Sequence, residues 1–309
     1  MSKKKDFLSV IDFSLEEIWS VFDQAEKFKK KKKSSNLLKN KQLAMIFSKS
    51  STRTRVSFEV GMSQLGGKAI FLNKNDIQLK KGESIYDTAK VLSRYVDGIM
   101  IRTFDHEDVT HLAGAADIPV INGLTDLLHP CQAMTDFFTI YENKHSLRRH
   151  PHEMKISFIG DGNNVASSLA LISSIMGVHF TIATPKGYEI PKQIVEIAQS
   201  NSEKSGAKIS FTNDLKKAAK DADVLYTDVW VSMGQEEEQK RKEEAFKDYQ
   251  INDELLKEAK TDVIVLHCLP ARRGLEITDE IMDGPHSRVF DQAENRLHVQ
   301  KAILAKLMK

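Results

Sequence analysis

The chain has 309 residues, of which 41% are hydrophobic and 28% charged, and its formal net charge is +2. This length favours two domains, and the composition is that of an ordinary soluble protein rather than a nucleic-acid-binding one. No stretch approaches the roughly 18 apolar residues of a membrane span, and the N-terminus resembles neither a secretory signal nor a transit peptide. Two cysteines, Cys131 and Cys268, do not make a disulfide framework. We therefore expect a reduced, cytoplasmic protein without membrane contact.

Lysines are concentrated at the start of the chain. Residues 1–50 contain twelve lysines against six acidic residues, and Lys29 to Lys33 are consecutive. Such a row can form a patch for nucleic acid or an anionic surface. Helical spacing of apolar residues predicts a helix over 14–30, however, and lysines suit a solvated helix C-terminus. No aromatic residue or arginine is interleaved, so we expect no nucleic-acid partner. Salt-dependent retention on DNA would test this.

After that helix, apolar runs and amphipathic stretches alternate in two series. This alternation indicates parallel sheets covered by helices on both faces, and two series indicate two α/β domains. A helix from 130 to about 145 is predicted between the series, and a closing helix over 292–308. The first series has predicted strands at 43–47, 68–72, 98–102 and 118–122, with helices at 54–65, 83–96 and 106–116. The second has strands at 155–159, 178–183, 207–211, 223–227 and 263–267.

The first predicted strand is followed by an anion-binding pattern. Ser51, Thr52, Arg53 and Thr54 open a helix, where free backbone N–H groups, hydroxyls and a guanidinium can surround an anion. Arg55 is two residues from Arg53 and cannot face the same side of the helix. We therefore assign Arg53 to the anion and Arg55 to a structural role. The alternative is a plain Ser/Thr helix cap with surface arginines.

Other polar residues follow further strands, where ligands bind in open α/β sheets. Arg102 ends the third strand, and its alternative is a surface arginine. His129 and Gln132 are three apart at a helix start, so both can lean over one ligand, although such a pair also occurs as a cap. Asp228 follows the strand at 223–227 and could hold an ammonium group. The segment Ser232-Met233-Gly234 and its charged continuation are typical of a mobile lid.

Two motifs admit a different chemistry. Gly160-Asp161-Gly162 suggests a nicotinamide-dependent dehydrogenase. The sixth position of that fingerprint is Val165, and no acidic residue for a ribose follows the next strand, so we read the adjacent asparagines as amides for a polar ligand. Cys268 could be a nucleophile, but without a positioned base it is more often a buried thiol.

Four segments in order, residues 51–55, 129–132, 228–234 and 267–270, resemble the aspartate/ornithine carbamoyltransferase family. The resemblance covers essentially the whole chain. It implies a carbamoyl-phosphate domain over 1–130 plus 292–309, an interdomain helix over 131–150 and an amino-acid domain over 151–291. It also implies a homotrimer or a multiple of trimers, and neither a cofactor nor a metal.

The resemblance further implies two sets of ligands. Before Glu83, relatives often carry Gly-His-Lys where this chain has residues 79–82, which leaves the details of a subunit-contact loop open. The implied carbamoyl-phosphate ligands are Ser51, Thr52, Arg53, Thr54, Gln78, Arg102, His129, Gln132, Cys268, Leu269 and Arg296. The implied ornithine ligands are Asn164, Asp228, Ser232 and Met233.

The implied reaction is attack of the neutral side-chain amine of ornithine on the carbonyl carbon of carbamoyl phosphate. Arg53 and Arg102 would stabilise the leaving phosphate, and His129 would polarise the carbonyl oxygen. Asp228 and Cys268 would orient the α-amino group of ornithine. We expect ordered binding with closure of the domains. An aspartate acceptor would need arginine and glutamine at residues 232–234, so the rival acceptors are other amines such as putrescine or a modified ornithine.

Overall fold

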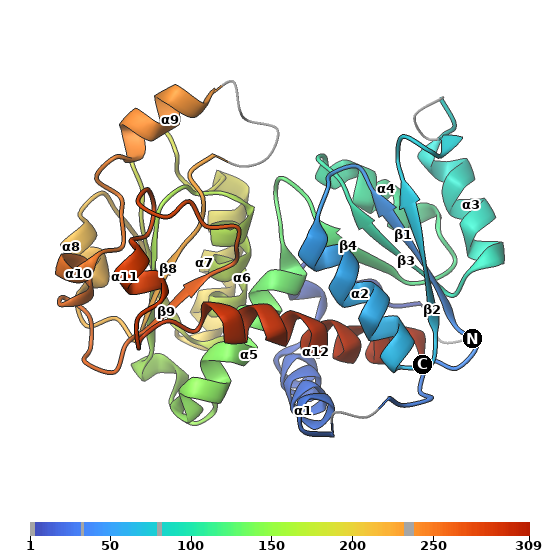
Figure 1. Cartoon of the computed structure of the whole chain (residues 1–309), viewed down its shortest axis with the longest axis horizontal. Coiled ribbons are helices and arrows are strands. Elements are labelled where there is room, and N and C mark those ends of the chain that lie inside the picture. Colours follow the sequence, from blue (N-terminus) through green and yellow to red (C-terminus); the bar gives the residue numbers. More distant parts are fainter. Residues whose placement is uncertain (1–3, 32–33, 79–81, 232–237) are drawn as a thin grey trace. The chain divides into compact units, whose positions relative to one another are not determined.

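The computed structural model describes residues 4–31, 34–78, 82–231 and 238–309 (Figure 1). The chain divides into two compact units: a first unit of Met1–Met134 with Glu294–Lys309, and a second unit of Thr135–Ala293. The chain passes from one unit to the other within two helices, α5 (Pro130–Asn143) and α12 (Val289–Met308). The predicted class, two parallel α/β domains joined by two helices, is confirmed.

The first unit contains a four-stranded parallel sheet in the order β2-β1-β3-β4. All residues of β1 except the first are buried, which explains its continuous apolar run. The order of the strands reverses between β1 and β3, and the crevice beyond such a switch point is where open α/β sheets bind ligands. The strands are β1 (Gln42–Phe47), β2 (Lys68–Asn73), β3 (Gly98–Arg102) and β4 (Val120–Leu124).

The strand β4 begins and ends two residues later than the sequence predicts. Pro119 has no N–H for the ladder, although its carbonyl accepts a hydrogen bond from Ile99 (2.9 Å). Further along, the register shifts so that Arg102 pairs with Leu124 and Gly123 is skipped. A Cβ on Gly123 would lie 2.5 Å from the sulfur of Met100 and 3.2 Å from the Ile101 carbonyl oxygen, so any other residue there would force the Met100 side chain to shift. The shift therefore lies beside Arg102, one of the predicted site residues.

Helices of the first unit follow the predicted spans closely. The helix α1 ends in Lys29, Lys30 and Lys31, so the described part of the lysine row is a helix end, and Lys32 and Lys33 lie outside the described residues. Figure 1 shows α3 and α4 side by side over the first sheet. The elements are η1 (Val10–Asp12), α1 (Leu15–Lys31), α2 (Thr52–Gln64), α3 (Ile85–Tyr95) and α4 (His106–Ala115).

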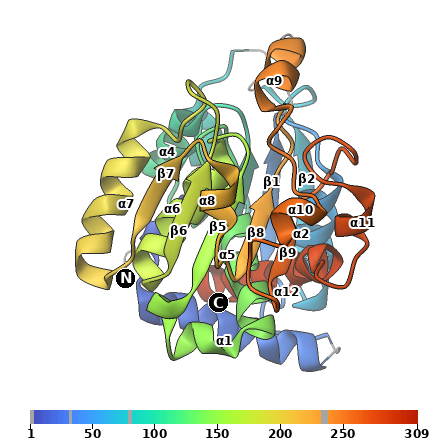
Figure 2. The ribbon, with the colours of Figure 1, turned by 90° about the vertical axis from the view of Figure 1, so that its left-hand side faces the viewer.

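The second unit contains a five-stranded parallel sheet in the order β7-β6-β5-β8-β9, visible in Figure 2. Its switch point lies between β5 and β8. The helices α6 and α7 pack side by side (Figure 2). The strands are β5 (Lys155–Ile159), β6 (His179–Ala183), β7 (Ile209–Thr212), β8 (Val224–Thr227) and β9 (Ile264–His267). The helices are η3 (His145–Arg148), η4 (Pro151–Glu153), α6 (Asn164–Met176), α7 (Lys192–Ser205), α8 (Leu215–Ala219), α9 (Gln239–Phe246), α10 (Asp253–Leu256) and α11 (Asp279–Met282).

A buried polar network ties four elements of the second unit together. Asp136 of α5 accepts hydrogen bonds from the Tyr226 hydroxyl (3.1 Å) and from Nε2 of Gln292 (2.6 Å). Gln292 in turn accepts from the backbone N–H of His267 (3.0 Å). The network therefore fixes the end of β9, where the predicted cysteine follows. Among the described helices, none has the length and apolar character needed to cross a bilayer.

Candidate active site

The first turn of α2 is the meeting point of two arginines. Ser51 has extended backbone angles and caps the helix, because its hydroxyl accepts from the Thr54 N–H (3.1 Å). The Thr54 hydroxyl in turn accepts hydrogen bonds from Nη1 of Arg102 (3.4 Å) and from Nη2 of Arg296 (3.4 Å). Thr54 and both arginines are buried. Two guanidiniums from β3 and α12 thus converge on a helix N-terminus, which is an arrangement suited to an anion.

The start of α5 adds His129 and Gln132 to this cluster. Oε1 of Gln132 accepts a hydrogen bond from Nη1 of Arg296, and the backbone carbonyl of His129 accepts from the Gln132 N–H (3.1 Å). Pro130 occupies the first helical position, which suits its fixed φ and its missing N–H. The structure therefore brings together residues from α2, β3, α5 and α12 that are far apart in the sequence.

The pKa of His129 reflects both its burial and the positive charge of the cluster. Its imidazole is buried, and this burial lowers its pKa well below the ordinary value. The positive charges of Arg296, Arg102 and Arg53 lower the pKa further. His129 is therefore neutral at physiological pH, and it can donate one hydrogen bond without adding charge. A field that disfavours an imidazolium favours an anion.

Three other predicted residues of this region differ in their surroundings. Arg53 is half-buried, and its charge acts on His129, whereas Thr52 is exposed. Arg55 turns away from Arg53: it pairs with Glu59 (3.0 Å) and lies over the Phe71 ring, 3.7 Å from its centroid.

Gln78 is exposed in the loop after β2, where its carbonyl accepts from the Glu83 N–H (3.2 Å). Among the described residues, no hydrogen bond joins its side chain to the cluster. Residues 79–81 of the predicted subunit-contact loop lie outside the described residues.

Lys49 is a buried residue that sequence reasoning missed. It forms an ion pair with Asp126, and its ammonium group lies 4.3 Å from the centroid of the Phe104 ring. It therefore joins the loop after β1, which carries Ser51, to the loop after β4, which leads to His129. The only available signal was its place within Ser48-Lys49-Ser50, which reads as a surface loop.

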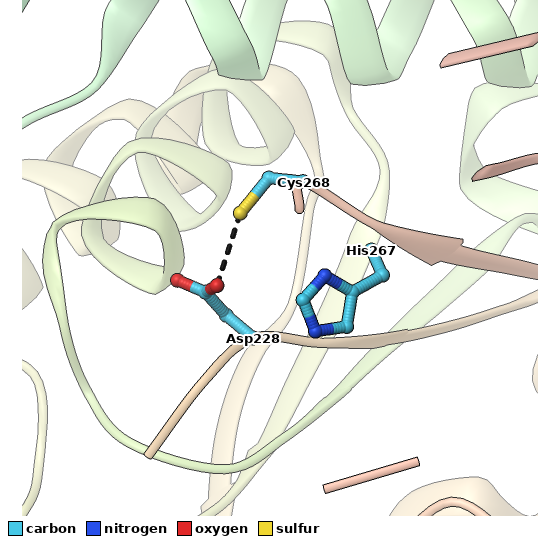
Figure 3. Close-up of side chains that lie close together, drawn as sticks. All are labelled: Asp228, His267 and Cys268. Atoms are coloured by element: carbon cyan, nitrogen blue, oxygen red, sulfur yellow. Dashed lines mark hydrogen bonds between the residues drawn. The ribbon is translucent and has the colours of Figure 1, made fainter. Parts of the chain in front are cut away.

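In the second unit, Asp228 is the centre of a second group of polar residues. It follows β8 and is buried. One carboxylate oxygen accepts from the Cys268 thiol (3.0 Å) and from the Val229 N–H (2.8 Å), and the other accepts from Nδ2 of Asn163 (2.8 Å). Figure 3 shows the thiol of Cys268 pointing to this carboxylate. Asp228 and Cys268 are thus in direct contact.

Asn163, which precedes the predicted ligand Asn164, contacts Asp228. Its Oδ1 caps α6 by accepting from the N–H groups of Val165 (2.9 Å) and Ala166 (3.1 Å), which leaves Nδ2 for the carboxylate. Asn164 is half-buried at the first position of the helix. A strand-to-helix turn ending in asparagine is a capping signal, so this role was open to sequence reasoning.

The glycine directly before Asn163, Gly162, serves packing. A Cβ on Gly162 would lie 2.4 Å from the backbone of Glu189 and Ile190, and its N–H donates to the Tyr188 carbonyl (2.8 Å). A neighbouring backbone therefore occupies the close approach that a pyrophosphate would need. Asp161 forms a buried ion pair with Lys242 of α9 (2.6 Å).

The side chains of Asp228, His267 and Cys268 lie close enough to hold a metal, since their ligand atoms are all within 4.8 Å of one another (Figure 3). His267 does not fit this role. Its Nδ1 accepts from the Leu269 N–H (2.9 Å), and its Nε2 bonds to Oε1 of Glu276 (3.1 Å). Both ring nitrogens are engaged, so His267 can serve neither as a metal ligand nor as a base for Cys268.

Leu269 is half-buried with a φ of 60°, which is uncommon for a residue with a branched side chain. Ser232 and Met233, the remaining predicted ligands, lie outside the described residues.

Comparisons with known proteins agree on one family. Family models described as "Aspartate/ornithine carbamoyltransferase, carbamoyl-P binding domain" and "Aspartate/ornithine carbamoyltransferase, Asp/Orn binding domain" match residues 5–142 and 152–307. An ornithine carbamoyltransferase of Methanosarcina mazei is 54% identical, covering 99% of this chain and 100% of the relative. An anabolic ornithine carbamoyltransferase of Pyrococcus furiosus is 51% identical, covering 98% and 96%. A solved structure of ornithine carbamoyltransferase from Pyrococcus furiosus superposes with a TM-score of 0.94 at 50% identity, covering 99% of this chain and 97% of that one. The chain belongs to the aspartate/ornithine carbamoyltransferase family.

Proposed function

We propose that this chain transfers the carbamoyl group of carbamoyl phosphate to the side-chain amine of L-ornithine, giving L-citrulline and phosphate. Relatives that carry the name ornithine carbamoyltransferase match it over almost their whole length. The observation that carries the proposal within the structure is the convergence of Arg102 and Arg296 on the first turn of α2. It provides charge and directed donors for a phosphorylated substrate.

Carbamoyl phosphate is assigned to the first unit. Its phosphate is bound by the N-terminus of α2 with Ser51, Thr52, Arg53 and Thr54, and by Arg102. A planar guanidinium suits this because it can donate to two phosphate oxygens at once. His129, Gln132 and Arg296 are assigned to the carbamoyl end. By family resemblance, Gln78 and the second unit's Cys268 and Leu269 complete the set, and these three stay predictions.

Ornithine is assigned to the residues around Asp228. The α-ammonium group is a cation, and the Asp228 carboxylate is a buried anion already oriented by Asn163 and Cys268. Holding the α-ammonium there leaves the side-chain amine free to react. Asn164, Ser232 and Met233 are further proposed ligands by resemblance to the family.

The chemistry needs little beyond positioning and charge stabilisation. The lone pair of the neutral amine attacks the carbonyl carbon, a C–N bond forms, and the bond from carbon to the bridging phosphate oxygen breaks. The phosphate leaves with the electron pair, and the proton lost by the amine passes to it. Arg53 and Arg102 stabilise the charge that develops on the phosphate, and His129 donates to the carbonyl oxygen. Alignment of two substrates can itself contribute about 7–11 kcal/mol to the barrier reduction.

We further propose that the chain works in the cytoplasm as a homotrimer or a multiple of trimers, in arginine biosynthesis. The family resemblance supports the assembly, and the anabolic relative of Pyrococcus furiosus supports the direction. Light scattering of the purified protein would measure the assembly, and a monomer would contradict it.

The decisive experiment is a citrulline assay. The purified chain is incubated with carbamoyl phosphate and L-ornithine, and in parallel with putrescine or an Nα-acylated ornithine at equal concentration. We expect citrulline to form, and the other two amines to react far more slowly because neither presents a free α-ammonium next to a carboxylate. Faster reaction with either alternative amine would assign the chain to that acceptor, and no carbamoylated product with any amine would overturn the proposal.

A further inference from the structure

His267 and Glu276 form a buried pair outside the groups assigned to either substrate. His267 is the last residue of β9, and Glu276 lies in the loop that leads to α11. Both side chains are 0% exposed. A carboxylate enclosed so completely is costly unless its charge is matched by donors. A specific role of the Glu276 carboxylate would explain why such a costly buried group is present.

The hydrogen bonds of this pair define the state of the imidazole. Nδ1 of His267 accepts from the Leu269 N–H (2.9 Å), so Nδ1 carries no proton. The ring proton therefore sits on Nε2, which donates to Oε1 of Glu276 (3.1 Å). Oε1 of Glu276 also accepts from the Arg272 N–H. The carboxylate thus selects one tautomer, as partners of functional histidines commonly do.

The group held by this tautomer is the backbone of Leu269. Leu269 has a φ of 60°, a left-handed conformation that costs roughly 1–2 kcal/mol for a residue with a Cβ. A hydrogen bond from its own N–H to His267, two residues earlier, offsets this cost. Cys268 lies between them, and its thiol donates to Asp228. The conformation of the segment 267–269 therefore sets the direction of that thiol.

We propose that Glu276, acting through His267, is a positioning residue that fixes the backbone of Cys268 and Leu269 for use of ornithine. This inference rests on the proposed carbamoyl transfer. Neither side chain touches a substrate: Glu276 orients the imidazole, the imidazole holds the Leu269 N–H, and the resulting turn aims the Cys268 thiol at Asp228. Loss of the relay leaves the first unit's carbamoyl-phosphate residues intact.

Two substitutions of His267 separate its two bonds. In His267→Asn, Oδ1 is as many bonds from the backbone as Nδ1, so it can accept from Leu269, and the bond to Glu276 is lost. In His267→Gln, the side-chain amide reaches the position of Nε2 and can donate to Glu276, and the bond to Leu269 is lost. We expect His267→Gln to lower kcat/KM for ornithine about 10-fold or more below His267→Asn, because it leaves a buried N–H unpaired.

A second pair tests the carboxylate. Glu276→Gln keeps an oxygen that can accept from Nε2, whereas Glu276→Leu removes the acceptor. We expect Glu276→Leu to raise KM for ornithine and lower kcat, and Glu276→Gln to recover most of the loss. Ile277→Val is the matched control, because Ile277 is a buried apolar neighbour in the same loop. It should lower Tm and leave KM for ornithine unchanged.

All variants are assayed well below their Tm, with binding of carbamoyl phosphate alone measured by calorimetry. Because Cys268 and Leu269 are also proposed ligands of carbamoyl phosphate, the proposal expects a smaller loss of carbamoyl-phosphate affinity than of kcat/KM for ornithine, together with the ranking of ornithine parameters above. Equal kcat/KM for His267→Asn and His267→Gln, or loss in Ile277→Val matching that in Glu276→Leu, would overturn it. A wild-type chain that forms no citrulline would instead overturn the proposed function, so the two failures are distinguishable.

Discussion

The thiol of Cys268 donates a hydrogen bond to Oδ1 of Asp228 over 3.0 Å, joining the residues that directly follow β9 and β8. This places Cys268 as a partner of the carboxylate rather than as a nucleophile. Cys268→Ser keeps a donor, but its shorter C–O bond moves that donor away from Asp228. We expect KM for ornithine to rise about 10-fold, equivalent to one weakened bond to a charged group, with measurable turnover retained. Steady-state citrulline formation gives both parameters. Complete loss of turnover, with a carbamoylated thiol found by mass spectrometry in the wild-type protein, would restore the nucleophile hypothesis.

Arg53 and Arg55 offer a matched comparison within one helix turn. Arg53 contributes positive charge at His129, whereas Arg55 is exposed and pairs with Glu59. Arg53→Ala should reduce kcat/KM at least 100-fold, since a charge-assisted bond contributes roughly 1.5–3 kcal/mol and arginine can make two to one phosphate. Arg55→Ala should retain activity within about threefold, because exposed pairs contribute at most about 1 kcal/mol. Similar losses in both variants would remove the assignment of Arg53 to phosphate.

The lowered pKa of His129 has a consequence for stability against pH. The unfolded chain binds a proton at this histidine near its ordinary pKa of 6.5, whereas the folded protein does not until a lower pH. Between these two values the unfolded state carries more protons, so stability falls as pH decreases below about 6.5, by up to about 1.4 kcal/mol per pH unit. Urea unfolding between pH 5 and 8 measures this slope. His129→Gln should flatten it, and an unchanged slope would mean that other groups cause it.

Structural features that depend on residues close together in the sequence were predicted better than contacts between residues far apart in it. Apolar runs such as 43–47 and 155–159 predict strands well because each run reflects burial along the strand itself. The placement of Ser51, Arg102 and Asp228 at the ends of strands was also predictable. Within each parallel sheet, the carboxyl ends of the strands lie at the same edge, which is where ligands bind. Pro119 shows a local limit, because its missing N–H delays β4 although the apolar pattern begins earlier.

Partners far apart in the sequence were not predictable. Lys49 meets Asp126 across 77 residues, and nothing within its own neighbourhood marks it as buried. Asn163 meets Asp228 across 65 residues, although its capping role was visible locally. Likewise, the Glu276 carboxylate meets His267 only when the loop after β9 is folded, so the sequence alone does not predict this contact. The chemistry of a site can be suggested by residue type, but its supporting contacts follow from the tertiary fold.

We expect substitution of Asp136, the centre of a buried hydrogen-bond network, to cause a large loss of stability. Asp136 accepts from Tyr226 and Gln292, and all three side chains are buried. Asp136→Ala removes the acceptor of the Tyr226 hydroxyl proton and one of the two acceptors of the Gln292 amide, whose Nε2 also donates to the Tyr226 oxygen (3.0 Å). A buried donor left without an acceptor costs roughly 1–3 kcal/mol. Tyr226→Phe removes one donor and leaves the carboxylate bonded to Gln292, so it should cost less. Urea unfolding of both variants measures the two losses. A larger loss in Tyr226→Phe than in Asp136→Ala would contradict this arrangement.

Substitution of Gln300 should weaken the binding of carbamoyl phosphate, although Gln300 is not itself a proposed ligand. It lies one turn after Arg296 on α12 and is fully buried. In the amide orientation that pairs both of its ends, its oxygen accepts from Nη2 of Arg296 (3.0 Å), and its nitrogen donates to the Arg296 carbonyl (3.1 Å) and to the Ser57 hydroxyl. The amide thereby fixes the guanidinium that also reaches Thr54.

Gln300→Leu preserves much of the volume and removes both ends of this support. We expect the Kd for carbamoyl phosphate to rise about 10-fold, since one bond to a charged group is lost and the guanidinium gains freedom. Calorimetry without ornithine measures it. Gln300→Glu is the informative companion, because a carboxylate at this position still accepts from Arg296 but also neutralises part of the charge that attracts phosphate. If Gln300→Leu bound as tightly as the wild type, the Gln300 amide would not be needed to hold the Arg296 guanidinium in place.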